Sequence, residues 1–185
     1  MSDLKGIRVA ILASDGVEQA ELTEPRKFLE QLGVQATLLT PEGTHIQAMQ
    51  HDEKTDKIPA DGSIEGANTE DYDAVLLPGG ALNADTLRMN QEARRFVREM
   101  ERAKKPLAVI CHAPWLLISA GLAKSRTMTS YYTIQDDLRN AGADWVDEEV
   151  VRDQNLVTSR QPSDIPAFNR AVADLLTQVR AKLAA

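Results

Sequence analysis

Short apolar runs that stop at turn residues recur along this chain and alternate with helical patterns. The runs are residues 7–13, 34–40, 73–77 and 107–110, and the first three end at Ser14-Asp15-Gly16, Pro41-Glu42-Gly43 and Pro78-Gly79-Gly80. Such β-branched and apolar runs are typical of buried strands. Because helical spacing lies between them, the pattern predicts right-handed βαβ units, a mostly parallel sheet and the α/β class.

The remaining segments predict further elements around this sheet. Apolar spacing predicts helices over residues 18–32, 92–102, 114–120, 133–140 and 165–182. Pro25 should kink the first helix or restart it. Residues 44–71 break the alternation and predict a hairpin or loop excursion at a sheet edge, and short strands are expected near Met128, Val150 and Leu156. Without a visible repeat or linker, the sequence predicts a single domain over residues 1–185.

Charge and cysteine content limit the function classes. The formal net charge is -7 and the isoelectric point is near 5.0, which argues against a nucleic-acid partner because such proteins usually carry a basic face. One cysteine cannot form an internal disulfide, and we see no basic and apolar signal segment before the first strand. We therefore expect a cytoplasmic protein that contacts neither nucleic acid nor membrane.

The only cysteine, Cys111, lies where the fourth apolar run stops and a proline-started helix begins. An α/β fold presents a nucleophile at such a strand-to-helix turn. The positive end of the following helix should favour the thiolate, which predicts a lowered thiol pKa. The alternative is a buried cysteine that acts as a small apolar residue.

Several cysteine chemistries are excluded by the histidines and by the cysteine count. The histidines are His45, His51 and His112, so no histidine follows Cys111-His112 at the distance that amidotransferases of class I or papain-like enzymes require. A Cys-x-x-Cys redox motif or a thiol-based zinc site cannot be formed with one cysteine. The cluster His45, His51, Asp52 and Glu53 fits no named metal-site spacing, so we expect no metal and no cofactor.

Residues at the carboxyl ends of neighbouring parallel strands should share one crevice with the thiol. Glu18 is then the expected acid facing the sulfur, protonated because of burial and the nearby charge. Gly79 and Gly80 form either an ordinary turn or, with the N–H of Ala113, an oxyanion hole for a tetrahedral intermediate.

Five motifs in order identify a resemblance that covers nearly the whole chain. They are residues 15–22 (DGVEQAEL), 75–80 (VLLPGG), 110–114 (ICHAP), 140–147 (NAGADWVD) and 158–162 (TSRQP). The chain resembles the ThiJ/PfpI superfamily, and within it the branch of PfpI-type intracellular proteases and general stress proteins. The resemblance implies a flavodoxin-like three-layer sandwich, similar to class I glutamine amidotransferases.

The resemblance also implies roles for individual residues. Cys111 would lie on a strained turn with Glu18 hydrogen-bonded to its sulfur, and His112 would pair with an acid from a second subunit, for which Asp85 is the best match. That arrangement implies a homodimer, or a hexamer built from dimers. Two aromatic residues, Tyr131 and Trp115, would line the mouth of the site.

One departure concerns the residue after the Cys-His pair. The family commonly has glycine there, whereas this chain has Ala113, whose methyl group should narrow the oxyanion side of the site.

Three functions remain open from the sequence. The first is a stress-response glyoxalase or deglycase that acts on reactive dicarbonyls or their protein adducts through Cys111, with Glu18 and His112 moving protons. The second is an intracellular cysteine peptidase that uses the same nucleophile. The third is a redox sensor or chaperone that turns over no substrate and oxidises at the same thiol.

Overall fold

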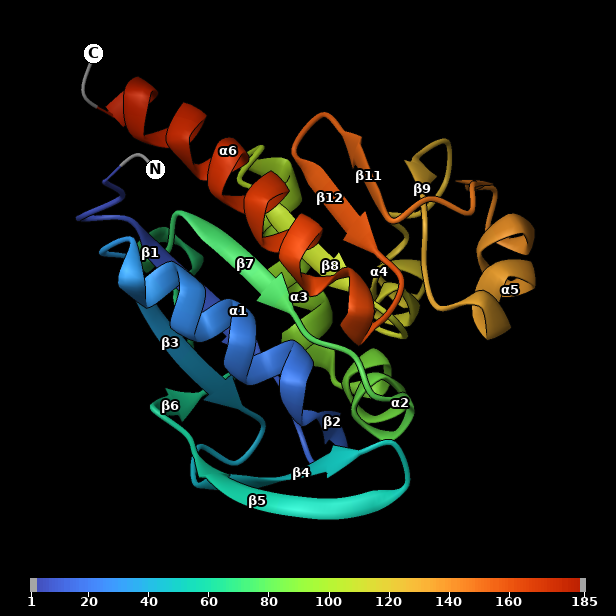
Figure 1. The fold of residues 1–185 in the computed structure, drawn as a ribbon, viewed down its shortest axis with the longest axis horizontal. Coiled ribbons are helices and arrows are strands. Elements are labelled where there is room, and N and C mark those ends of the chain that lie inside the picture. The colour runs from blue at the N-terminus through green and yellow to red at the C-terminus, as the bar shows by residue number, and fades with distance from the viewer. Residues whose placement is uncertain (1–2, 184–185) are drawn as a thin grey trace.

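The computed structural model describes residues 3–183, in which seven strands form one central sheet in the order β11-β12-β8-β7-β1-β3-β6 (Figure 1). The strands are β1 Arg8–Leu12, β3 Gln35–Thr40, β6 Gly62–Ser63, β7 Ala74–Leu77, β8 Leu107–Ile110, β11 Val150–Asp153 and β12 Leu156–Ser159. Neighbouring strands are parallel except β11, which runs antiparallel to β12 at one edge. The predicted mostly parallel sheet is confirmed.

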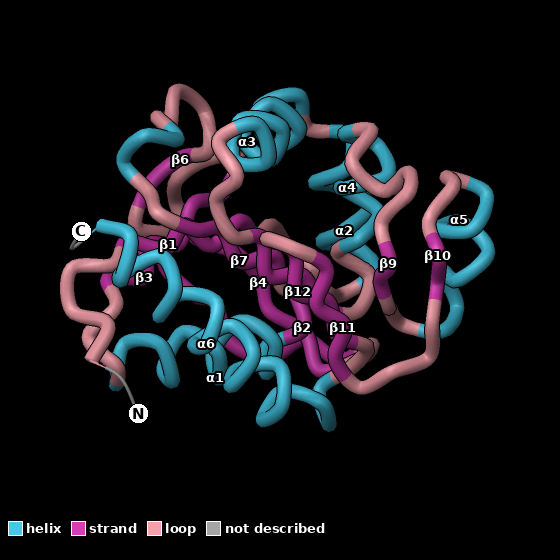
Figure 2. The backbone as a smooth tube through the Cα atoms, turned by 90° about the horizontal axis from the view of Figure 1, so that it is seen from above, coloured by secondary structure: helices cyan, strands magenta, loops and turns pink. Residues whose placement is uncertain are grey.

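Helices cover both faces of this sheet and complete three layers (Figure 2). On one face lie α1 Gln19–Gln31 and α6 Ile165–Leu183. On the other lie α2 Ala81–Met89, α3 Gln91–Arg102 and α4 Pro114–Ala120. Alternate residues of β1 divide between the two cores, since Val9 and Ile11 pack toward α1 and α6 while Ala10 and Leu12 pack toward α3 and α4. This two-sided burial explains why the strands read as continuous apolar runs.

The excursion predicted over residues 44–71 is a hairpin, as expected. Strands β4 His45–Gln50 and β5 Glu53–Pro59 pair antiparallel, and β2 Val17–Glu18 joins β4 in a separate three-stranded sheet. Figure 1 shows this hairpin below the carboxyl end of β3, beside the start of α1. The hairpin therefore forms one wall of the region into which the parallel strands point.

Two expectations about helices need correction. α1 runs without a break through Pro25, which is buried, so the proline removes one backbone hydrogen bond but does not restart the helix. α2 was not predicted, because the polar residue Asn83 occupies one of its three buried positions and the helix begins at Ala81, directly after the Pro78-Gly79-Gly80 turn. A short pair, β9 Thr127–Met128 and β10 Asp144–Trp145, and a helix, α5 Gln135–Asn140, extend from the sheet beside α4.

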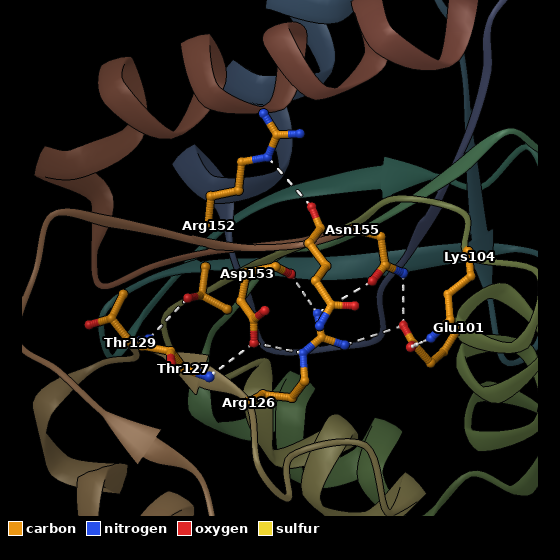
Figure 3. A network of polar contacts seen from close by, with 10 residues as sticks. Glu101, Lys104, Arg126, Thr127, Thr129, Arg152, Asp153 and Asn155 are labelled. Atoms are coloured by element: carbon orange, nitrogen blue, oxygen red, sulfur yellow. Dashed lines mark hydrogen bonds and ion pairs between the residues drawn. The ribbon is translucent and has the colours of Figure 1, made fainter. Parts of the chain in front are cut away.

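A polar network ties the amino ends of β8 and β12 to the end of α3 (Figure 3). The guanidinium of Arg126 bonds to the side chain of Asp153 at 3.0 Å, to the Asp153 carbonyl at 2.6 Å and to Asn155 at 3.3 Å, and it lies 3.5 Å from Glu101. Asn155 also donates to Glu101 at 2.7 Å. The three charged side chains are 12–18% exposed, so their charges depend on one another for compensation.

Replacing Arg126 with Met should therefore lower the free energy of unfolding by about 3 kcal/mol, because two largely buried carboxylates lose their shared cation. Urea denaturation measures the change. Arg152→Met is the matched control, since Arg152 is exposed and, among residues 3–183, bonds only to Gln178 and a backbone carbonyl, and it should change stability by less than about 0.5 kcal/mol. Equal effects of the two substitutions would contradict the assigned role of Arg126.

No helix within residues 3–183 combines the length and the apolar character needed to cross a membrane.

Candidate active site

Cys111 lies directly after β8 in a left-handed backbone conformation, with φ of 64°. Its N–H donates to the carbonyl of Ser159 at 3.1 Å, and its carbonyl accepts from the N–H of Tyr131 at 2.9 Å. Ser159 is the last residue of β12, the strand beside β8, and Tyr131 lies in the segment between β9 and α5. A cysteine with positive φ is strained, and these two hydrogen bonds hold it in place. The thiol is 6% exposed and opens onto a cavity of about 460 Å³.

The acid beside the sulfur is Glu21, not the predicted Glu18. Glu21 is fully buried on α1, its carboxyl lies beside Cys111 across Gly79, and its Oε2 accepts from the N–H of Gly79 at 2.8 Å, while its Oε1 has no hydrogen-bond partner within residues 3–183. Glu18 instead ends β2, and its Oε2 accepts from the N–H of His51 at 3.0 Å. Pairing of β2 with β4 turns Glu18 toward the hairpin, and one helical turn later Glu21 points at the thiol.

Gly79 allows this close approach of carboxyl and thiol. A Cβ at this position would lie under 3.0 Å from Glu21 Oε2 and from the Cβ of Cys111. Only glycine therefore leaves room for the Glu21–Cys111 contact.

Replacing Gly79 with Ala should lower the free energy of unfolding by about 2–3 kcal/mol, because overpacking forces the carboxyl or the strand end to move. Gly62→Ala is the control, since a Cβ there meets only the flexible tip of Leu39 at 3.2 Å, and its cost should stay below about 1 kcal/mol. Chemical denaturation of both variants checks the difference. Wild-type stability in the Gly79 variant would show that the contact tolerates a methyl group.

Of the three N–H groups considered for an oxyanion hole, those of Gly79, Gly80 and Ala113, the Gly80 group faces the sulfur and the other two do not. The N–H of Gly79 is committed to Glu21, and that of Ala113 donates to the carbonyl of Ile110 at 3.1 Å. The N–H groups that face the sulfur belong to Gly80, at the start of α2, and to His112. These two donors, rather than Gly79 and Ala113, are placed to stabilise negative charge at the reacting centre.

Burial sets the protonation of the acid and the thiol. It raises the pKa of Glu21 from about 4.5 to about 8, against the lowering effect of the Gly79 and Cys111 hydrogen bonds. Burial, and then the charge of Glu21, also raise the pKa of the Cys111 thiol, although the N–H groups of Gly80 and His112 oppose this. The lowered thiol pKa predicted from the helix field is therefore wrong, because desolvation outweighs the field. At neutral pH both groups hold a proton.

The imidazole of His112 lies beside the thiol, within reach of a proton transfer. Its Nδ1 lies 3.1 Å from Cys111 Sγ, and its Nε2 lies 3.4 Å from the Thr133 hydroxyl. Burial lowers the pKa of His112, so the imidazole is neutral and can accept a proton. The ring stacks on Tyr131 with centroids 4.8 Å apart and meets the edge of Trp115 at 5.5 Å. Cys111 and His112 thus form a nucleophile–base pair within one chain.

Comparison with known proteins identifies the family to which this chain belongs. Residues 7–175 match the model of the DJ-1/PfpI family. The chain belongs to the DJ-1/PfpI family. It is 41% identical to general stress protein 18 of Bacillus subtilis over 173 residues, which cover 92% of this chain and 98% of that one.

Other relatives of the DJ-1/PfpI family carry different names. The chain is 38% identical to the putative cysteine protease YraA of Bacillus subtilis, with 91% and 98% of the two chains covered, and 36% identical to the deglycase PfpI of Pyrococcus furiosus, with 92% and 99% covered. The crystal structure of Drosophila melanogaster DJ-1beta superposes with a TM-score of 0.83 at 26% identity, over 100% of this chain and 98% of that one. The three-layer sandwich is thus a DJ-1/PfpI fold.

Residues from six segments line the cavity of this DJ-1/PfpI chain. They are Glu18, Glu21, His51, Gly80, Ala81, Cys111, His112, Tyr131, Gln161, Pro162 and Ser163. Tyr131 lines the cavity, whereas Trp115 is not among its lining residues: it meets the His112 ring edge-on and donates from its Nε1 to Asp137 at 2.7 Å. The sequence prediction missed Glu21, His51 and residues 161–163. Residues 161–163 follow the carboxyl end of β12. Residues at the carboxyl ends of neighbouring parallel strands share one crevice, so the argument used for Gly79 and Cys111 applies to them as well.

Two other groups that the sequence singled out do not form the contacts considered for them in the described part of one chain. Asp85 is exposed on α2, and within residues 3–183 of one chain it makes no hydrogen bond or ion pair with His112. His45, His51, Asp52 and Glu53 do not gather: the described residues contain no cluster of three or more histidine, cysteine or acidic side chains that could hold a metal.

Proposed function

We propose that this DJ-1/PfpI protein is a stress-response enzyme that acts on reactive dicarbonyls or their protein adducts through Cys111, without a cofactor. The observation that carries the proposal is a buried thiol 3.1 Å from a neutral histidine and beside a protonated carboxyl, at the base of a cavity of about 460 Å³. Relatives named deglycase and general stress protein support this reading. A small carbonyl compound fits such a site, and none of the proposed steps needs a second thiol.

The first chemical step joins the sulfur to the aldehyde carbon. His112 Nδ1 takes the thiol proton as Sγ attacks, and the proton then passes to the former carbonyl oxygen to give a hemithioacetal. The N–H groups of Gly80 and His112 stabilise the negative charge that develops during attack. Glu21 stays protonated beside the sulfur because burial raises its pKa to about 8, so the pair never carries two negative charges.

The second step moves a proton from the former aldehyde carbon to the adjacent carbonyl carbon, through an enediol, with His112 as the base and then the acid. This step converts the hemithioacetal of methylglyoxal into a thioester of lactate. Water then cleaves the thioester, releasing lactate and returning the proton to sulfur. One methylglyoxal and one water therefore give one lactic acid, with no external oxidant or reductant.

Purified protein incubated with methylglyoxal in the absence of glutathione should consume the aldehyde and release an equal amount of lactate. Loss of methylglyoxal by derivatisation and an enzymatic lactate assay measure the two sides of the reaction. Consumption without lactate, at the rate of simple thiol trapping, would overturn the proposal.

We further propose that a second copy of the chain completes the site. Asp85 lies on an exposed face of α2 that also presents Leu82 and Met89, which are 64% and 68% exposed. Tyr132, the residue after Tyr131, is 59% exposed. Burying such apolar side chains favours association. Asp85 of the second copy would then orient His112. Sedimentation should show a dimer, and a fully active monomer would contradict the proposal.

A cysteine peptidase is the second candidate, favoured by the same 3.1 Å contact between Cys111 and His112 and by the relative named a putative cysteine protease. In that reaction His112 protonates the leaving amine. Hydrolysis of denatured casein or of short peptides, lost in His112→Gln, would support it. The redox sensor has less support, because burial raises the pKa of Cys111 and thiols oxidise as thiolates.

A further inference from the structure

A second hollow adjoins the thiol cavity along the first turns of α1. This α1 hollow has a volume of about 330 Å³ and is lined by Glu18, Gln19, Ala20, Thr23, Glu24, Gln50, His51, Thr55 and Pro162. Glu18, His51 and Pro162 line both the hollow and the thiol cavity. These three residues therefore border both spaces, and the hollow lies next to the place where a molecule would bind at Cys111.

The lining of the α1 hollow is polar and carries negative charge without a lysine or an arginine. Glu18 is 8% exposed, and its Oε2 is fixed by the N–H of His51 at 3.0 Å, so the carboxyl is held between the two spaces. Glu24 lies exposed at the far end, and Gln19 donates to Asp56 at 2.9 Å, which adds a third carboxylate nearby. Thr55 lines the hollow with a buried hydroxyl oxygen that has no partner within residues 3–183.

We propose that the α1 hollow is a second subsite that binds a cationic group, a primary ammonium or a guanidinium, attached to the carbonyl compound that reacts at Cys111. Two carboxylates without a competing cation favour such a group, and they disfavour an anionic one. A three-carbon dicarbonyl would leave the hollow empty. The nature of the reacting carbonyl group rests on the proposed function. The preference for a positive charge rests only on the carboxylates that line the α1 hollow.

Labelling of Cys111 by methanethiosulfonates tests the charge preference without turnover. The probes are the cationic trimethylammonium-ethyl reagent, the anionic sulfonato-ethyl reagent and the neutral hydroxyethyl reagent, which place their charges within reach of Glu18. In wild type, the cationic reagent should react faster than the anionic one after correction for their rates with a free thiol. Glu18→Gln should lower the cationic-to-neutral rate ratio about threefold, as expected for loss of one charge at about 6 Å in a water-like dielectric, and Glu24→Gln should lower it in the same direction by a smaller factor.

Glu65→Gln is the matched control, because it removes the same charge from an exposed position that lines neither space. Its rate ratios should equal those of wild type. Ratios in Glu18→Gln and Glu24→Gln that equal the Glu65→Gln values would overturn the subsite. Glu24→Gln guards against misfolding, since Glu24 is exposed.

A second arm uses turnover. The ratio of kcat/KM for methylglyoxal adducts of free arginine to kcat/KM for methylglyoxal should fall about threefold in Glu24→Gln. Equal losses for both substrates would contradict the subsite. If wild type processed neither substrate, the proposed function would fail, while the labelling ratios would still decide whether the subsite exists.

Discussion

Cys111→Ser should lower the rate of methylglyoxal conversion to lactate by at least about a thousandfold. A serine hydroxyl is far less nucleophilic than a thiol, and the neutral His112 at 3.1 Å cannot compensate for the difference. The side chains are similar in size, and the serine inherits the same left-handed backbone and its two hydrogen bonds. The loss should therefore be chemical, with little change in folding.

The measurement is lactate release under substrate excess, together with far-ultraviolet circular dichroism and urea denaturation of the variant. Because Cys111 is the only cysteine in the chain, loss of reaction with a thiol reagent verifies the substitution directly. His45→Gln is a suitable control, since His45 is exposed and lines neither the thiol cavity nor the α1 hollow, and its activity should stay within about twofold of wild type. Equal activity of Cys111→Ser and wild type would remove the thiol from the mechanism.

Glu21→Gln should make the protein more stable, by a margin that grows with pH to about 3–5 kcal/mol at pH 8. Glutamine keeps the shape of the protonated carboxyl and its oxygen can still accept from the Gly79 N–H, but it cannot ionise. Wild type, by contrast, must keep a proton on a fully buried carboxyl. The functional acid is thus expected to reduce the stability of the fold.

The sign follows from the raised pKa of Glu21. In the unfolded chain this carboxyl loses its proton near pH 4.5, whereas in the folded protein it keeps the proton up to about pH 8. Between these values the unfolded state binds fewer protons, so wild-type stability falls by about 1.4 kcal/mol for each pH unit on account of this group. Above about pH 8 both states are ionised and the contribution is constant.

Urea denaturation of wild type and Glu21→Gln at pH 5, 6, 7 and 8 measures the growing margin. Glu24→Gln, an exposed position on the same helix, is the control and should change stability by less than about 0.5 kcal/mol throughout. If the stability curves of Glu21→Gln and wild type ran parallel from pH 5 to pH 8, the carboxyl would be ionised in the folded state. The assigned proton on Glu21 would then be wrong.

The order of strands and helices could be predicted from the sequence, because buried strands appear as short apolar runs and helices as apolar residues at helical spacing. The apolar runs at β1, β3, β7 and β8 and the turn residues after them were sufficient, and β11, β12 and α6 followed from the same signals. α2 could not be predicted, since Asn83 is buried by hydrogen bonds to backbone carbonyls rather than by apolar contact. Hydropathy does not report that kind of burial.

The sequence by itself determined the parallel α/β fold, the strand-end position of Cys111 and the exclusion of a distant triad histidine. Only the tertiary structure decided which acid meets the sulfur, because Glu18 and Glu21 are one helical turn apart and the pairing of β2 with β4 selects between them. It also decided which N–H groups are free and the sign of the thiol pKa shift. These properties depend on desolvation and on contacts between distant segments, which no local pattern records.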